Sequence, residues 1–111
     1  MVCLLFNLGS FIEAMKKYVK LSPEFMCYPI WMEEDNLFLP INHFDLKISN
    51  ELKQKIDVWD AQYQSIYLED YPQDSKFKTV IDEIKFIEAG YEIKKALQLE
   101  LGDGYEVFYQ P

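Results

Sequence analysis

The most regular pattern of apolar positions in this chain lies between residues 49 and 66. Apolar side chains recur there at spacings of 4, 3, 4 and 3, which places them on one face of a helix of about five turns. The members of this stripe are Leu52, Ile56, Trp59, Tyr63 and Ile66. The opposite face, which we expect to meet solvent, carries Lys53, Asp57, Asp60, Gln64 and Tyr67. Ser49 is a favourable N-cap, and the helix must end by Tyr71 because Pro72 disfavours helical dihedrals in the residue before it.

A second helix is predicted after residue 79. Thr79 and Asp82 resemble a capping box at its start. The apolar positions that we assign to its buried stripe are Ile84, Ile87, Tyr91, Leu97 and Leu101. Gly90 lies inside this helix at a cost of about 1 kcal/mol relative to alanine, which we interpret as close contact with the first helix. Gly102 and Gly104 end the helix.

Residues that favour β-structure are concentrated at 18–32 and 105–109. Pro23 and Pro29 limit the first of these segments to broken or edge strands, because proline cannot donate to a ladder. Directly after the first segment comes an acidic stretch, residues 33–36, which predicts an exposed turn. Residues 37–39 then form a short return strand before Pro40.

This order of elements predicts one α+β domain covering residues 1–111, with two antiparallel amphipathic helices packed on a small, mostly antiparallel sheet. The terminal strand is expected to pair with the early strands. Residues 1–14 fit either a short extra element or a misassigned start, with Met15 as the alternative origin. Their apolar stretch lacks a basic flank and is much shorter than the roughly 20 residues of a bilayer span.

The charge balance narrows the partners that this domain can bind. The chain has 19 acidic residues against 11 basic ones, all lysine, for a formal net charge of −8 at pH 7. DNA, RNA and anionic membranes are disfavoured, because each would be repelled over a Debye length of about 8 Å. A basic protein is the natural complement. Cys3 and Cys27 are too few for a secreted disulfide scaffold, so we expect two buried, reduced thiols in a cytoplasmic protein.

Catalytic and metal chemistry have little support in the sequence. His43 is the only histidine, and no serine or cysteine nucleophile motif accompanies it, which favours a loop histidine over a general base. Neither Cys3, Cys27 and His43 nor the carboxylates have the spacing of a zinc or calcium site. No glycine belongs to a phosphate-binding motif. We therefore expect no enzyme activity, no metal and no cofactor.

Residues 69–77 combine acidic and aromatic side chains in the connection between the two predicted helices. Aromatic residues beside charge are typical of binding hot spots, which favours a partner site around Tyr67, Tyr71 and Phe77. The alternative is an ordinary interhelical loop whose aromatic side chains pack into the core. The sequence leaves both interpretations open.

Four segments of the chain resemble immunity proteins of bacterial contact-dependent growth inhibition systems. These segments are residues 59–64, 69–77, 86–90 and 99–107, and the likeness covers roughly residues 16–110. The resemblance implies a protein that binds the C-terminal domain of a cognate toxin and blocks it. Because many such toxins are nucleases with basic clefts, it also implies that an acidic inhibitor masks the active-site cleft.

We predict that the toxin-binding surface combines acids with tyrosines on and beside the interhelical loop. Its members are Asp60, Tyr67, Glu69, Asp70, Tyr71 and Asp74, with Glu33, Glu34 and Asp35 as a second acidic patch. The acids would face lysines and arginines of the toxin, and the tyrosines would fill pockets between them. Two alternatives stay open: an oligomeric or structural adaptor that self-associates through its apolar N-terminus, and a small hydrolase that uses carboxylates with His43.

Overall fold

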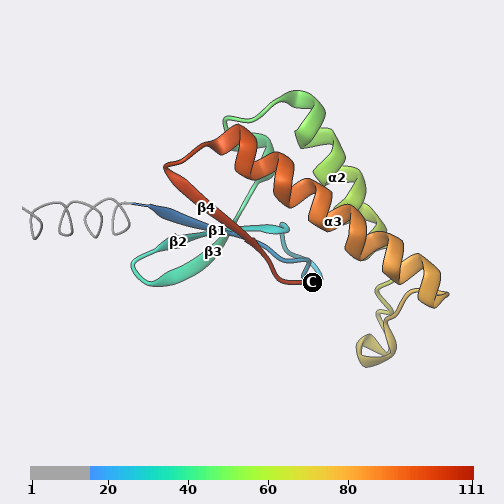
Figure 1. Cartoon of the computed structure of the whole chain (residues 1–111). Coiled ribbons are helices and arrows are strands. Elements are labelled where there is room, and N and C mark those ends of the chain that lie inside the picture. The colour runs from blue at the N-terminus through green and yellow to red at the C-terminus, as the bar shows by residue number, and fades with distance from the viewer. Residues whose placement is uncertain (1–15) are drawn as a thin grey trace, which may run out of the picture.

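A computed structural model describes residues 16–111 of the chain. Within this range, Figure 1 shows two long helices lying over one face of a four-stranded sheet. The elements are β1 (Lys17–Leu21), β2 (Ile30–Glu34), β3 (Leu37–Ile41), η1 (His43–Asp45), α2 (Asn50–Gln64), η2 (Pro72–Asp74), α3 (Val80–Leu101) and β4 (Tyr105–Tyr109). The α+β class is therefore confirmed. The alternatives for residues 1–14 lie outside the described residues, and so does Cys3.

The sheet has the order β3-β2-β1-β4. β1 pairs antiparallel with β2, and β2 pairs antiparallel with β3. β4 instead pairs parallel with β1, with Val19 opposite Val107. The parallel pairing arises because α3 returns the chain to the start of β1, where the Lys17 N–H donates to the Gly104 carbonyl at 3.0 Å. The predicted pairing of the terminal strand with an early strand is thus confirmed, but the sheet is mixed.

The acidic turn predicted at residues 33–36 is confirmed at Asp35 and Asn36, whereas Glu33 and Glu34 belong to strand β2. Its central residues, Asp35 and Asn36, have φ values of 52° and 66°, as in the hairpin turns that suit aspartate and asparagine. The return strand does not stop before Pro40 as predicted, because β3 continues to Ile41. β3 is an edge strand, where a proline can be accommodated without removing a central ladder bond.

The hydrophobic core lies between the sheet and the two helices. Its buried apolar residues are Val19, Leu21, Ile30, Leu52, Ile56, Trp59, Phe86, Ile93, Leu97 and Val107. Trp59 of α2 joins the helices, since its ring stacks on Phe86 of α3 with centroids 4.6 Å apart. The indole N–H of Trp59 also donates to the Phe86 carbonyl at 2.9 Å. One side chain therefore supplies both apolar and polar contact across the helix pair.

α2 begins at its predicted N-cap, where the Ser49 hydroxyl accepts from the Leu52 N–H at 3.2 Å. Of the predicted stripe, Leu52, Ile56 and Trp59 are buried, whereas Tyr63 and Ile66 are half-buried. The helix ends at Gln64 and is shorter than predicted. It ends early because the backbone tightens, with the Tyr67 N–H donating three residues back to the Gln64 carbonyl at 3.2 Å.

α3 also begins as predicted, with the Thr79 hydroxyl accepting from the Asp82 N–H at 3.0 Å. Its buried residues are Phe86, Gly90, Ile93 and Leu97. The predicted stripe was therefore partly wrong, because Ile84 and Tyr91 are exposed. Apolar residues occur on every side of this helix, so its sequence fits several stripes, and only packing against the sheet selects one.

Gly90 makes a close approach, but not to α2 as predicted. A Cβ atom at Gly90 would overlap the ring of Tyr109 on β4. That ring is also held edge-on by Trp59, at a centroid distance of 6.1 Å, and by Tyr91, at 4.7 Å. Gly90 thus allows α3 to rest directly on the last strand.

Gln98 of α3 fixes the position of β4. Its Oε1 accepts from the Val107 N–H at 2.8 Å, and its Nε2 donates to the Tyr105 carbonyl at 2.8 Å. These bonds satisfy backbone groups of a strand that has β1 as its only neighbour in the described sheet. The helix therefore positions the strand by polar as well as apolar contacts.

We expect Gly90→Ala to lower the free energy of unfolding by about 1–3 kcal/mol, because overpacking against Tyr109 outweighs a gain of about 1 kcal/mol in helix propensity. Urea unfolding followed by circular dichroism measures the change. Gly104→Ala is the control, since no atom lies within 4 Å of a Cβ at Gly104. Equal stabilities of the two variants would contradict the close contact.

Burial, together with the nearby Tyr91, raises the pKa of Tyr109 to about 12. The folded protein therefore keeps a proton that the unfolded chain loses above an ordinary pKa of 10.0, so stability falls as the pH rises from about 10 to about 12. We expect Tyr109→Phe to reduce this alkaline loss in a series of urea unfolding curves. An unchanged pH dependence would show that Tyr109 titrates as in the unfolded chain.

Candidate functional site

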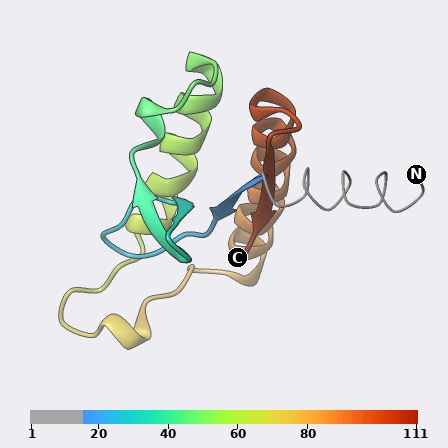
Figure 2. The same ribbon diagram turned by 90° about the vertical axis from the view of Figure 1, so that its left-hand side faces the viewer.

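The connection between α2 and α3 carries four of the predicted site residues on an exposed loop. We call residues 69–74 the acidic loop; it includes η2, and Figure 2 shows it in yellow beyond the ends of both helices. Glu69, Asp70, Tyr71 and Asp74 are all exposed. The base of the loop is closed by the Leu68 N–H, which donates to the Ser75 hydroxyl at 2.9 Å. The loop thus presents three carboxylates and one aromatic ring to solvent.

The aromatic residues of this segment divide between the two interpretations of the sequence. Phe77 packs into the core, with its ring centroid 5.0 Å from that of Phe86. Tyr67 is half-buried and lies 5.0 Å from the ring of Phe25. Tyr71 remains 62% exposed. Only Tyr71 is therefore fully available to a partner, while the other two rings anchor the ends of the segment.

Asp60 lies on α2 in a polar cluster. The sequence predicted that it would be exposed to solvent, but it is half-buried. Its carboxylate accepts from the Gln64 amide at 3.3 Å. Burial raises the pKa of Asp60 above its ordinary value, and the hydrogen bond from Gln64 opposes that shift only in part. Of the face predicted to be solvated, Asp57 is exposed, whereas Lys53, Asp60, Gln64 and Tyr67 are half-buried. The difference arises because the loop between β1 and β2 covers part of this face.

The second acidic patch lies far from the acidic loop. Glu33 and Glu34 are exposed at the end of β2, and Asp35 is exposed in the turn that follows. Figure 1 places this turn and the loop between α2 and α3 at opposite ends of the domain. The predicted site residues on the acidic loop and at the end of β2 therefore form two separate surfaces, and Asp60 lies on α2, apart from both.

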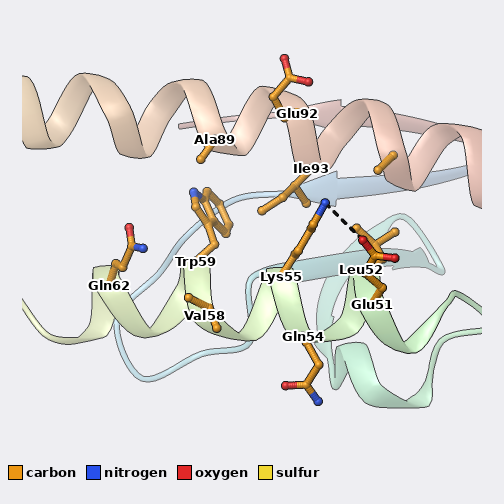
Figure 3. Close-up of a pocket in the computed structure, with 11 residues that line it drawn as sticks. Glu51, Leu52, Gln54, Lys55, Val58, Trp59, Gln62, Ala89, Glu92 and Ile93 are labelled. Atoms are coloured by element: carbon orange, nitrogen blue, oxygen red, sulfur yellow. Dashed lines mark ion pairs between the residues drawn. The ribbon is translucent and has the colours of Figure 1, made fainter.

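A groove between α2 and α3 was not predicted from the sequence. Figure 3 shows its side chains, which enclose a volume of about 760 Å³. Trp59 and Ile93 line it from the two helices, and Lys55 pairs with Glu51 at 3.8 Å along its edge. The sequence feature that could have indicated this groove is Ala89, a small residue of α3 that leaves space beside Trp59.

Comparison with known protein families assigns the chain to one family. Residues 17–111 match the family described as Serratia CdiI immunity protein-like. The chain belongs to this family. A comparison with curated proteins found no match. The matched range starts with β1 and continues to the C-terminus, so it includes the sheet, both long helices and the acidic loop. The resemblance to immunity proteins of contact-dependent growth inhibition is therefore confirmed.

In this CdiI-like protein the single histidine has a structural environment. His43 is 2% exposed and lies in η1, with its ring 4.6 Å from that of Phe44. Its Nε2 lies 3.2 Å from the Asp57 carboxylate, and Nε2 is the donor because a carboxylate only accepts. The pair ties η1 to α2. A ring so buried is poorly placed to take a proton from a substrate.

The remaining expectations concern metal binding, membrane spans and cysteine burial within residues 16–111. No cluster of three or more histidine, cysteine, aspartate or glutamate residues in that range could hold a metal ion. No helix in the same range is both long and apolar enough to cross a membrane. Cys27 is half-buried, not buried as predicted.

We expect Asp57→Ala to lower the free energy of unfolding by about 1–3 kcal/mol, because it leaves the buried Nε2–H of His43 without an acceptor. Asp57→Asn is the matched control, since its side-chain oxygen can still accept this bond. Urea unfolding followed by tryptophan fluorescence compares the two. A loss of equal size in both variants would argue against the hydrogen bond as the cause.

Proposed function

We propose that this immunity protein binds the C-terminal domain of a cognate toxin in the cytoplasm and neutralises it by covering a basic active-site cleft. The observation that carries this proposal is the family match over residues 17–111. The net charge of −8 supports a basic partner, and a nuclease cleft, built to hold phosphates, is the basic site that such an inhibitor fits best. No chemical step by the immunity protein is needed.

The acidic loop is the proposed centre of contact. Asp70 and Asp74 are exposed and face no described ion-pair partner, so toxin lysines or arginines can approach them. Such attraction raises the association rate toward values on the order of 10⁸–10⁹ M⁻¹s⁻¹ at low salt. Tyr71 supplies the apolar area that slows dissociation once it fills a pocket.

The remaining predicted residues have secondary roles in this proposal. Tyr67 packs on Phe25 just before the loop, and Asp60 binds Gln64 on α2, so we assign neither to direct contact at the centre. Glu33, Glu34 and Asp35 are at the other end of the domain, so we assign them to long-range attraction and not to contact within the same cleft. The adaptor alternative depends on residues 1–14, which lie outside the described range, and the hydrolase alternative is weakened by the burial of His43.

The double variant Asp70→Lys with Asp74→Lys tests the acidic loop. We expect it to slow association about tenfold or more at low salt, with little change in dissociation, because it reverses the charge that attracts the toxin. The difference should shrink as salt is added. Surface plasmon resonance against the inactivated toxin domain encoded by the adjacent upstream gene measures both rates.

A matched control is available at the other end of α3. Asp103→Lys with Glu106→Lys makes the same change in net charge at two exposed acids. It should retain most of the association rate. Equal slowing by both double variants would assign the effect to net charge alone, and unchanged kinetics in both would remove the acidic loop from the interface.

A further inference from the structure

An exposed apolar side chain projects from the loop between β1 and β2. Met26 is 83% exposed and lies in a turn within residues 22–29, the segment that connects β1 to β2. Its backbone is left-handed, with a φ of 63° that favours glycine or asparagine over methionine. Neither core packing nor backbone preference therefore explains methionine at this position.

The turn is held in place by one side chain of α2. The Gln64 Oε1 accepts from the Met26 N–H at 2.9 Å, and its Nε2 donates to the Glu24 carbonyl at 2.9 Å. Next to it, Phe25 stacks on Tyr63 at 4.4 Å. The backbone of the turn is thus fixed on both sides while the Met26 side chain points away from the core. Such presentation lowers the entropy lost when a partner binds.

The turn is continuous with the acidic loop. Phe25 contacts Tyr67, which lies just before the loop, at a ring distance of 5.0 Å. Two carboxylates lie at the turn, because Glu24 belongs to it and is exposed, and Asp60 accepts from the same Gln64 amide that binds the Glu24 carbonyl. An apolar side chain within a negative field complements an apolar pocket edged by lysines or arginines.

We propose that Met26 is a second anchor of the toxin-binding surface, entering an apolar pocket on the basic toxin while the neighbouring acids pair with its edge. This inference rests on the proposed function and adds a contact to it. A flexible thioether side chain adapts well to such a pocket. Met26 then governs dissociation, whereas the acidic loop governs association.

Two substitutions separate this role from folding. Met26→Gly and Met26→Asn both remove the apolar side chain and both tolerate the left-handed backbone, so neither should be less stable than the parent in urea unfolding. Both should speed dissociation from the inactivated upstream-encoded toxin domain about tenfold, with association unchanged. Leu99→Gln is the control, because Leu99 is 84% exposed on α3 and should bind as the parent does.

The outcomes distinguish this inference from the proposed function. Parent-like dissociation in both Met26 variants, with the Asp70→Lys and Asp74→Lys variant still slow to associate, overturns the anchor and leaves the proposed function standing. Faster dissociation that accompanies a loss of stability in both variants also overturns it, because the turn would then be structural. Failure of the parent protein to bind the toxin domain overturns the proposed function itself.

Discussion

The contact between Trp59 and Phe86 sets the arrangement on which the surface of this protein depends. Trp59 is only 2% exposed, stacks on the Phe86 ring and donates its indole N–H to the Phe86 carbonyl. It also meets Tyr109 of β4, so α2, α3 and the sheet converge on one side chain. Because the acidic loop connects α2 to α3, this contact fixes where the loop begins and ends. The loop can then expose its acids without contributing to the core.

Both proposed anchors derive from the same aromatic cluster. Phe86 contacts Phe77 at the end of the interhelical segment and Tyr63 on α2, and Tyr63 in turn stacks on Phe25 beside Met26. The two surface segments are therefore supported by one connected aromatic network, centred on the buried Phe86, and not by independent packing. A partner that contacts both finds them already positioned, which reduces the ordering that binding requires.

The parts of the fold that sequence could predict are those with local causes. The caps at Ser49 and Thr79 and the turn at residues 35–36 follow from neighbouring residues and were confirmed. The buried face of α3, the partner of Gly90 and the parallel β4 depend on tertiary contacts that no local pattern contains. The same holds for the surface: loop composition predicted exposed acids, but the exposure of Met26 depends on Gln64, which is distant in sequence.

Under the proposed function, Asp60 would make the surface costly in the free protein and useful in the complex. Its carboxyl is half-buried and its pKa is raised by that burial, so at neutral pH the ionised group destabilises the folded state relative to an exposed aspartate. A cationic side chain of the toxin placed beside it would offset this penalty, because an opposite charge favours the ionised form. Binding would thus recover free energy that folding alone leaves unfavourable. In the proposed complex, a negative group partly below the surface would therefore favour a basic partner over solvent.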